Sequence, residues 1–180
     1  MPEILNMPGC IGLSLLVDHA SSRCIATSSW QDEEAMHATT ESIQRLRDRF
    51  VAEMGGSGTV VDEWEIALMH RDHPSIEGAR ARVTWLQGAP ASVDASVESF
   101  RAILPLVDQL PGFCSVSLLV NRQAGRAVST VIYDSADTLA QTRTRANDLR
   151  SQMAAQTGAE VLEVAELELA VAHLRVPEMA

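Results

Sequence analysis

Apolar residues alternate with small or polar ones in two stretches that read almost alike, residues 10–18 (CIGLSLLVD) and 113–121 (FCSVSLLVN). Each stretch ends at turn-forming residues, and a second run rich in β-forming side chains follows over 24–30 and 127–133. Such runs with a short turn between them are typical of a β-hairpin. The pattern therefore predicts two hairpins.

A helix is predicted after each hairpin, because apolar residues then recur at near-helical spacing. Asp32 and Ser135 are N-cap candidates, and Gly55 and Gly158 can take the left-handed conformation that ends a helix. The apolar faces are formed by Met36, Ile43, Leu46, Phe50 and Met54 in the first helix and by Leu139, Ala146, Leu149 and Met153 in the second.

The second half of the chain carries one strand and one helix more than the first. Both halves end in a predicted strand, over 60–70 and over 162–173. Residues 81–88 (ARVTWLQG) are predicted to form a further strand, and residues 91–110 a helix with a kink at Pro105. The second half is therefore a complete βαββαβ unit, which is the ferredoxin-like arrangement.

The two halves match each other at a constant shift of 103 residues. From Pro8 to His70, 18 of 63 residue pairs are identical, against about four expected from ordinary residue frequencies. We therefore interpret the chain as an internal duplication. It comprises a first, incomplete ferredoxin-like repeat over 1–74, a linker over 75–79 and a complete second repeat over 80–177.

The first repeat lacks its opening strand and most of its first helix, because residue 1 falls opposite Leu104 of the second repeat. That strand is central in a ferredoxin-like sheet, so its absence leaves a gap. Three explanations stay open: a start about 25 residues further upstream, a second chain that fills the gap, or a rearranged first unit. Exposed strand edges favour pairing, and we therefore expect a homodimer.

The βαββαβ unit, the Pro-Gly that opens each hairpin at Pro8 and Pro111 and the tandem repeat resemble the antibiotic-biosynthesis-monooxygenase group of the dimeric α+β barrel superfamily. The resemblance covers nearly the whole chain. It implies an α+β fold in which two ferredoxin-like units pack sheet against sheet to form a barrel. It also implies oxidation of electron-rich aromatic substrates, such as anthrones or quinols, without a bound cofactor or metal.

Alternation in the predicted strands indicates which face would line the barrel. The face expected to meet the helices comprises Ile11, Leu13, Leu15 and Val17 in one strand and Cys114, Val116, Leu118 and Val120 in its equivalent. The opposite face is small and partly polar and carries Ser14 or Ser117. In the last strand of the first repeat, one face is expected to carry Trp64, Ile66, Leu68 and His70.

Two equivalent pairs of titratable residues are candidates for the catalytic base that the resemblance implies. His70 and His173 can titrate near neutral pH. Glu65 and Glu168 would have a raised pKa if they pointed into a closed cavity. Each pair also has a structural interpretation, since a histidine at a strand end usually bonds a backbone carbonyl and a glutamate at a strand edge is usually exposed.

Substrate binding is assigned to two equivalent aromatic residues, Trp30 and Tyr133, as walls of the site. The hydroxyl groups expected beside them belong to Ser14, Ser117, Thr27 and Thr130. Trp64 and Trp85 are interpreted as packing residues. Haem-degrading relatives use an Asn on the first strand, and the absence of Asn from residues 81–88 argues against haem.

A metal site is not predicted. His70, Asp72 and His73 have a spacing that a metal could use, but the second half has no matching set, so we interpret them as part of a solvated linker. The sequence also has no Gly-rich phosphate loop, G-x-S-x-G elbow or H-E-x-x-H helix. These absences argue against the commoner nucleotide-dependent and hydrolytic functions.

Composition narrows the class of partner. The formal net charge of −10, from 24 acidic and 14 basic residues, gives no electrostatic footprint for nucleic acid. No window approaches the roughly 18 apolar residues of a membrane span, and we expect a cytoplasmic protein. Cys10, Cys24 and Cys114 are an odd number without C-x-x-C spacing, which favours reduced structural thiols.

Two classes of function are compatible with these features. The first is a cofactor-independent monooxygenase that oxidises a small aromatic or quinol-type metabolite in the barrel. The alternative is a non-catalytic barrel that binds a small hydrophobic ligand or serves as an oligomerisation module. A cavity lined by Ser117, Thr130, Tyr133 and a Glu168 with raised pKa would favour the enzyme, and a cavity filled by leucines would favour the structural role.

Overall fold

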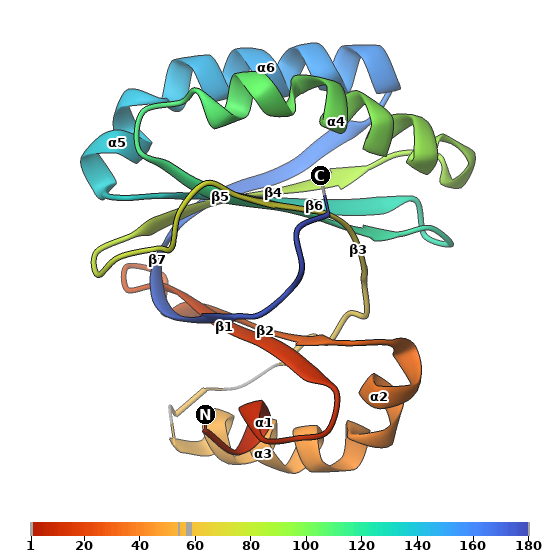
Figure 1. Ribbon diagram of the computed structural model, residues 1–180, viewed down its shortest axis with the longest axis vertical. Helices are drawn as coiled ribbons and strands as arrows, with labels where there is room; N and C mark the ends of the chain where they lie inside the picture. Colours follow the sequence, from red (N-terminus) through yellow and green to blue (C-terminus); the bar gives the residue numbers. More distant parts are fainter. Residues whose placement is uncertain (1, 54, 57–58, 180) are drawn as a thin grey trace.

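The computed structural model describes residues 2–53, 55–56 and 59–179 and has an α+β architecture (Figure 1), as predicted. The strands are β1 (Cys10–Asp18), β2 (Arg23–Trp30), β3 (Glu65–Arg71), β4 (Arg80–Gln87), β5 (Phe113–Asn121), β6 (Arg126–Tyr133) and β7 (Glu160–Leu174). The helices are α1 (Pro2–Leu5), α2 (Glu33–Ala38), α3 (Thr40–Glu53), α4 (Val93–Asp108), α5 (Ala136–Gln141) and α6 (Arg143–Thr157), with a 3-10 turn η1 at Pro90–Ser92.

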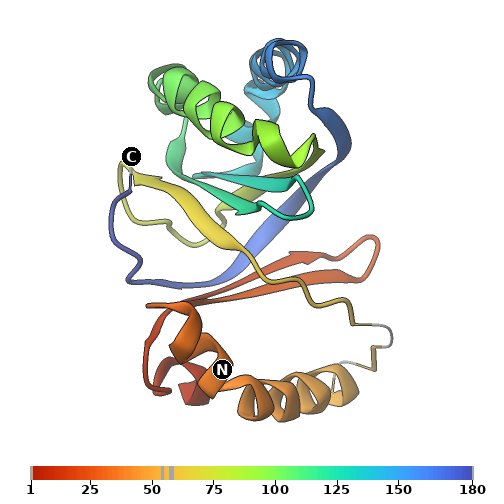
Figure 2. The same ribbon diagram turned by 90° about the vertical axis from the view of Figure 1, so that its right-hand side faces the viewer.

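The strands form one antiparallel sheet in the order β2-β1-β7-β4-β6-β5-β3. The sheet curls, so that β1 and β2 lie below β4, β5 and β6 in Figure 1. Helices α4 and α6 cover the outer face of the upper part, and α1, α2 and α3 lie beyond the lower hairpin (Figure 2). Strand β7 joins the two parts, since its first half pairs with β4 and its second half with β1.

Elements of the two halves coincide after a shift of 103 residues. Strand β5 is the equivalent of β1, β6 of β2 and α5 of α2, in each case with both bounds shifted by this number. The pairing of β1 with β7, in which Leu13 lies opposite His173, has the same register as the pairing of β5 with β3. Each last strand also carries an extra residue at the equivalent place, Ala170 in β7 and Ala67 in β3.

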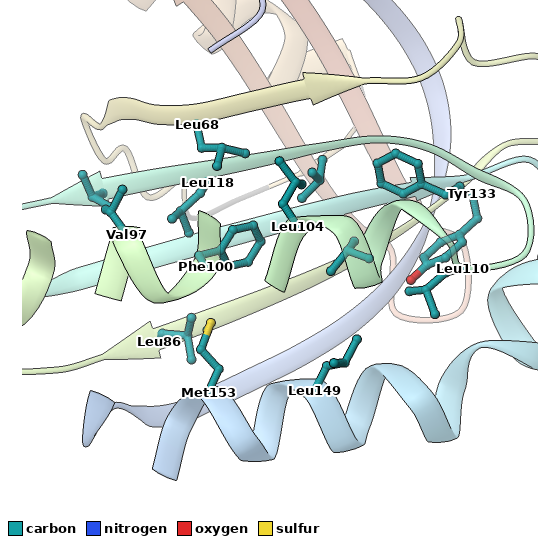
Figure 3. Close-up of a cluster of buried hydrophobic side chains, with 14 of the residues drawn as sticks. Leu68, Leu86, Val97, Phe100, Leu104, Leu110, Leu118, Tyr133, Leu149 and Met153 are labelled. Carbon is teal, nitrogen blue, oxygen red and sulfur yellow. The ribbon is translucent and has the colours of Figure 1, made fainter. Parts of the chain in front are cut away.

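Two clusters of buried side chains cover both faces of the sheet. The outer cluster lies between the sheet and the helices, where Figure 3 shows Phe100 of α4 close to Leu118 of β5 and Met153 of α6 close to Leu86 of β4. The inner cluster lies within the curl and contains Leu16, Ala79, Ala81, Val83, Cys114, Val128, Ile132 and Leu167. Burial of both faces explains why neighbouring residues of β4, such as Ala81, Arg82, Val83 and Thr84, are all buried.

The predicted faces of β5 are mostly correct. Val116 and Leu118 lie on the helix side in the outer cluster, as predicted. Cys114 is the exception, because the pairing of β5 with β6 shifts register between Phe113 and Ser115. The shift turns the Cys114 side chain into the inner cluster.

The prediction that Trp64, Ile66, Leu68 and His70 share one face is wrong. Leu68 is fully buried in the outer cluster, whereas Trp64 packs against the inner one. The pairing of β3 with β5 skips Ala67, and an extra residue of this kind reverses the alternation of the residues on either side. Trp64 and Ile66 therefore face the cavity, whereas Leu68 faces the helices.

The predicted helix starts are confirmed. Asp32 accepts a hydrogen bond from a backbone N–H of the first turn (2.8 Å), and Ser135 forms a capping box. Each predicted helix is divided into two, at Thr39 and at Thr142, whose hydroxyl groups bond backbone carbonyls of the preceding turn. Met54, predicted on the first helix, lies outside the described residues. No helix in the described ranges has both the length and the apolar character to cross a bilayer.

Candidate functional site

A cavity of about 2160 Å³ lies along both faces of β2, partly inside the curl of the sheet and partly between β2 and α3. Its inner wall is formed by residues of β1, β2, β4, β5 and β6, and it extends to one side along α3 and the segment that precedes β3. Apolar side chains of the inner cluster, such as Leu16, Val83 and Val128, contribute to the wall without filling the space. The cavity is therefore large enough for a small organic molecule.

Hydroxyl groups line this cavity in two equivalent cross-strand pairs. Ser14 of β1 lies opposite Thr27 of β2, and Ser117 of β5 lies opposite Thr130 of β6. All four residues are half-buried and contribute to the cavity wall. Ser14 and Ser117 lie on the inner face, as strand alternation predicted, and Thr27 and Thr130 lie opposite them. Their role in substrate binding stays a prediction.

Two tryptophans that the sequence left as packing residues also line the cavity. Trp64 and Trp85 are half-buried and pack against the inner cluster. The guanidinium of Arg126 lies 5.2 Å from the ring centre of Trp64, and that of Arg23 lies 4.8 Å from the ring centre of Trp85. The sequence could have placed Trp85 on the inner face, since it alternates with Ala81 and Val83 along β4.

The two arginines are held in place by acidic partners. Arg126 donates a hydrogen bond to Asp62 (Nη1 to Oδ1, 3.2 Å), and Arg23 donates to Glu163 through both of its terminal nitrogens. A cation over an aromatic face is attracted by the negative charge of the π system. The cavity thus carries two aromatic surfaces, each with positive charge beside it.

The predicted pair of aromatic walls is divided by the structure. Trp30 lines only the part of the cavity on the outer face of β2, because strand alternation puts it on the side opposite Ile25, which packs against the inner cluster. Tyr133 is fully buried in the outer cluster. Its hydroxyl accepts a hydrogen bond from Arg82 (3.2 Å), so Tyr133 is a structural residue and not a cavity wall.

The two candidate glutamates lie in different surroundings. Glu65 lines the cavity and accepts two hydrogen bonds from Arg122 (2.7 and 2.9 Å), which lower the pKa of its carboxyl group. A raised pKa, expected for a glutamate in a closed cavity, is therefore not found at Glu65. Glu168 pairs with Arg80 (3.2 Å) outside the cavity wall. Neither residue is a carboxyl group held in an apolar pocket.

Neither of the two candidate histidines lies in the cavity wall. His70 lies between two carboxylates, with Nδ1 2.6 Å from Glu178 and Nε2 3.0 Å from Asp108, and it stacks on Phe113. Both ring nitrogens must carry hydrogen to donate to both partners, so the bonded form is the imidazolium. Its equivalent His173 is exposed.

The pKa of His70 follows from this arrangement. Burial alone would lower it, but the hydrogen bonds to Asp108 and Glu178 outweigh burial and raise the pKa above its usual value. The contribution of these bonds to stability is fully present below the unfolded pKa of about 6.5 and is lost as the pH rises through the folded pKa. At pH values below its folded pKa, the charged His70 therefore links Glu178, after β7, to Asp108 at the end of α4.

We expect His70→Gln to lower the melting temperature more at pH 6 than at pH 9, because only the charged ring makes both bonds. Thermal unfolding followed by circular dichroism at the two pH values measures the difference. His173→Gln, at the exposed equivalent position, is the control and should show no such dependence. An equal loss for His70→Gln at both pH values would contradict the charged arrangement.

Three potential metal ligands lie together at one end of the sheet. Donor atoms of His73, Cys114 and Asp134 lie within 4.8 Å of one another, and such a set is typical of zinc ligands. Burial raises the pKa of the Cys114 thiol to about 12, and the thiol donates a hydrogen bond to Asp134 (3.2 Å). The group is thus satisfied by internal hydrogen bonding. The other possible metal set, His70, Asp72 and His73, is not formed, because His70 bonds Glu178 and Asp108.

Comparison with known proteins decides the family. The scan against protein-family models gives no match. The chain is 52% identical to the uncharacterised protein Rv2558 of Mycobacterium tuberculosis, over 99% of this chain and 76% of that protein. It is 51% identical to Rv2557 of the same organism, over 99% of this chain and 80% of that protein. The chain belongs to the Rv2557/Rv2558 family.

Solved structures that resemble this member of the Rv2557/Rv2558 family share its fold at low sequence identity. An anthrone oxidase-like protein matches with a TM-score of 0.68 at 13% identity, over 97% of this chain and 82% of that chain. A candidate monooxygenase of Fusobacterium nucleatum matches with 0.66 at 14%, over 92% and 78%. A ferredoxin-fold protein of Listeria monocytogenes related to antibiotic biosynthesis monooxygenases matches with 0.53 at 8%, over 93% and 98%. These proteins therefore share the fold of this chain.

Proposed function

We propose that the cavity binds a small aromatic or quinol-type metabolite and that the protein oxidises it with molecular oxygen, without a bound cofactor. The observation that carries the proposal is the cavity wall, on which Trp64 and Trp85 offer aromatic surfaces beside hydroxyl groups. The names of the structural neighbours, anthrone oxidase-like and candidate monooxygenase, support the class of reaction.

The wall suits a planar ring with a phenolic or quinol oxygen. Stacking on Trp64 or Trp85 would hold the ring, and Ser117 and Thr130 would hydrogen-bond its oxygen. Arg23 and Arg126 would supply the positive charge that stabilises a deprotonated substrate. In a substrate with a ring CH₂ group, such as an anthrone, the carbon would lose a proton to solvent and the carbanion would combine with O₂. The peroxide would take back a proton and lose water, so that CH₂ and O₂ give a ring carbonyl and one water.

The repeated register also supports a proposal about the origin of the fold. We propose that the fold consists of two ferredoxin-like units formed by internal duplication. Identical shifts of β1 to β5, β2 to β6 and α2 to α5 support this origin, as does the extra residue at Ala67 and Ala170. The duplication would explain why the hydroxyl pairs occur twice in one cavity.

A second candidate function is ligand binding without chemistry. The observation that favours it is the state of the candidate bases, since Glu65 is bonded to Arg122 and His70 to two carboxylates. In this case the cavity would still take an aromatic ligand, and oxygen would not be consumed. Binding and turnover therefore have to be measured separately.

We expect the double variant Trp64→Leu/Trp85→Leu to weaken binding of an anthrone or quinol about tenfold or more, because it removes both inner aromatic surfaces. Isothermal titration calorimetry measures the affinity without relying on the remaining tryptophan. Oxygen uptake, recorded with an electrode in parallel, distinguishes the monooxygenase from the binding barrel.

Trp30→Leu is the matched control, since Trp30 lies on the other face of β2, and it should leave the affinity within about twofold. Affinity that falls with Trp30→Leu and not with the double variant would move the ligand to the other face of the sheet. Absence of binding by both the anthrone and the quinol would contradict the proposed function.

A further inference from the structure

The curled sheet has an open seam between its two edge strands. In the described part of the chain, β2 pairs only with β1, and β3 pairs only with β5 among the strands. After the shift of 103 residues, β2 corresponds to β6, and the segment Thr59–Glu65 corresponds to Leu162–Glu168 of β7. In the second half these two elements flank β4 and pair with it on both sides. The seam is therefore the place that corresponds to β4.

Residues 59–64, on one side of the seam, correspond to a part of β7 but do not form a strand. Residues 59–64 are irregular, and Val60 and Val61 are 85% and 52% exposed. The corresponding part of β7 is a strand because it pairs with β4. The tail after β7 covers only the far end of the β3 edge, where Met179 N–H donates to the Met69 carbonyl (2.7 Å). The edge beside 59–64 is left open.

In the second half, β4 is fixed by a buried arginine. Arg82 is 3% exposed and donates to Glu166 of β7 (2.9 and 3.2 Å) and to the Leu139 carbonyl (2.8 Å). It also donates to Thr142 Oγ1 and to the Tyr133 hydroxyl, both at 3.2 Å. Four partners from three elements thus recognise one side chain of the inserted strand.

Three of the four acceptors for such an arginine are also present beside the seam, whereas Tyr133 corresponds to Trp30, which cannot accept a hydrogen bond. Glu63 corresponds to Glu166, Thr39 to Thr142, and the Met36 carbonyl to that of Leu139. Thr39 is buried, and its hydroxyl donates to the Met36 carbonyl (2.9 Å), as Thr142 donates to the Leu139 carbonyl (2.8 Å). Glu63 is 60% exposed, and its ion pair is with His37 at 3.5 Å.

We propose that the seam is the binding site of an eighth β-strand, which carries an arginine facing Glu63 and Thr39 and is joined through a helix to α1. The position of α1 supports the join, because its last residue, Leu5, corresponds to Asp108 at the end of α4. The side of α3 that would contact the helix, with Ile43 and Phe50, lines the cavity, whereas Met153 of α6 is buried against α4.

We expect the occupant to resemble residues 79–108 in sequence, because these residues form β4 and α4, the two elements that the first half lacks. A second copy of the chain cannot donate its own β4, because β4 already pairs on both edges. Rv2558 and Rv2557 extend beyond the region that matches this chain, which spans 76% and 80% of their lengths. Such proteins have room for a strand and a helix in addition to the matched elements.

The test is to place a copy of Ala79–Leu104 directly ahead of Pro2 in the 180-residue chain, in place of Met1. We expect amide hydrogen exchange at Thr59–Trp64 and along β2 to slow by on the order of a hundredfold, because the open edges gain a hydrogen-bonded partner. A synthetic peptide of Ala79–Asp108, added to the original chain, gives the same readout without a fusion.

Recognition of the arginine is tested by Glu63→Gln. In the fusion protein this change should lower the melting temperature by roughly 5 °C, and in the original chain, where Glu63 is exposed, by no more than about 1 °C. Replacing the added arginine with methionine should remove this difference between the two backgrounds. These results would support the assigned contacts.

Two outcomes would overturn the proposal. Unchanged exchange at 59–64 in both the fusion and the peptide mixture would mean that the seam does not accept this strand. Protection of the same residues in a dimer of the original chain, unaffected by the added strand, would assign the seam to a second copy. Sedimentation velocity of each sample identifies the dimer.

Discussion

Arg82→Ala will lower the free energy of unfolding by about 3–5 kcal/mol. Arg82 is almost fully buried and joins β4 to β7, β6 and α5 through its hydrogen bonds. Its removal leaves the Tyr133 hydroxyl and the Leu139 carbonyl with a lost donor in a region without access to water. Urea denaturation followed by circular dichroism measures the loss.

Arg80→Ala is the matched control on the same strand. Arg80 is 30% exposed and makes an ion pair with Glu168, which is 38% exposed, so its removal should cost only about 0–1 kcal/mol. A comparable loss for the two variants would mean that burial of the Arg82 guanidinium does not determine its effect. The comparison therefore separates the buried hydrogen-bond network from surface charge.

Phe100→Ala will also cost about 3–5 kcal/mol of unfolding free energy, because it leaves a cavity in the outer cluster. Phe100 is 4% exposed and lies among side chains of β5, α4 and α6 (Figure 3). Guanidinium denaturation of the variant gives the change. The slope of the transition should stay the same, because the extent of the folded structure does not change.

Leu106→Ala, six residues further along the same helix, is the control. Leu106 is 40% exposed, and its truncation should change stability by no more than about 0.5 kcal/mol. If both variants lost the same free energy, the packing of α4 against the sheet would differ from the structure. Ligand affinity of Phe100→Ala, measured below its unfolding transition, should equal that of the parent, since Phe100 does not line the large cavity.

The elements and their order could be predicted because their signals are local. Alternation marked the hairpins, and Asp32 and Ser135 marked the starts of the helices that follow. The division of each helix at Thr39 and Thr142 was not predicted, since a threonine hydroxyl that bonds its own preceding turn leaves no periodic signal. The 15-residue length of β7 depends on two different partners, which the sequence of β7 alone does not reveal.

The candidate site was predicted in part for the same reason. Ser14, Ser117, Thr27 and Thr130 lie on the cavity wall because each sits in a regular stretch of strand. Trp64 was missed because the extra residue at Ala67 puts Trp64 and Leu68 on opposite faces, whereas unbroken alternation would put them on the same face. Tyr133 was assigned to the cavity because its partner Arg82, 51 residues earlier in the chain, could not be identified without the sheet register.

The β7 strand has a consequence for how the chain folds as it is synthesised. Leu13 pairs with His173, a sequence separation of 173 − 13 = 160 residues. The hairpin of β1 and β2 therefore leaves the ribosome early and waits with an unpaired edge until almost the whole of β7 has emerged. During that interval the exposed edge can pair with other nascent chains, so production in cells should depend on translation rate and on chaperones that shield strand edges.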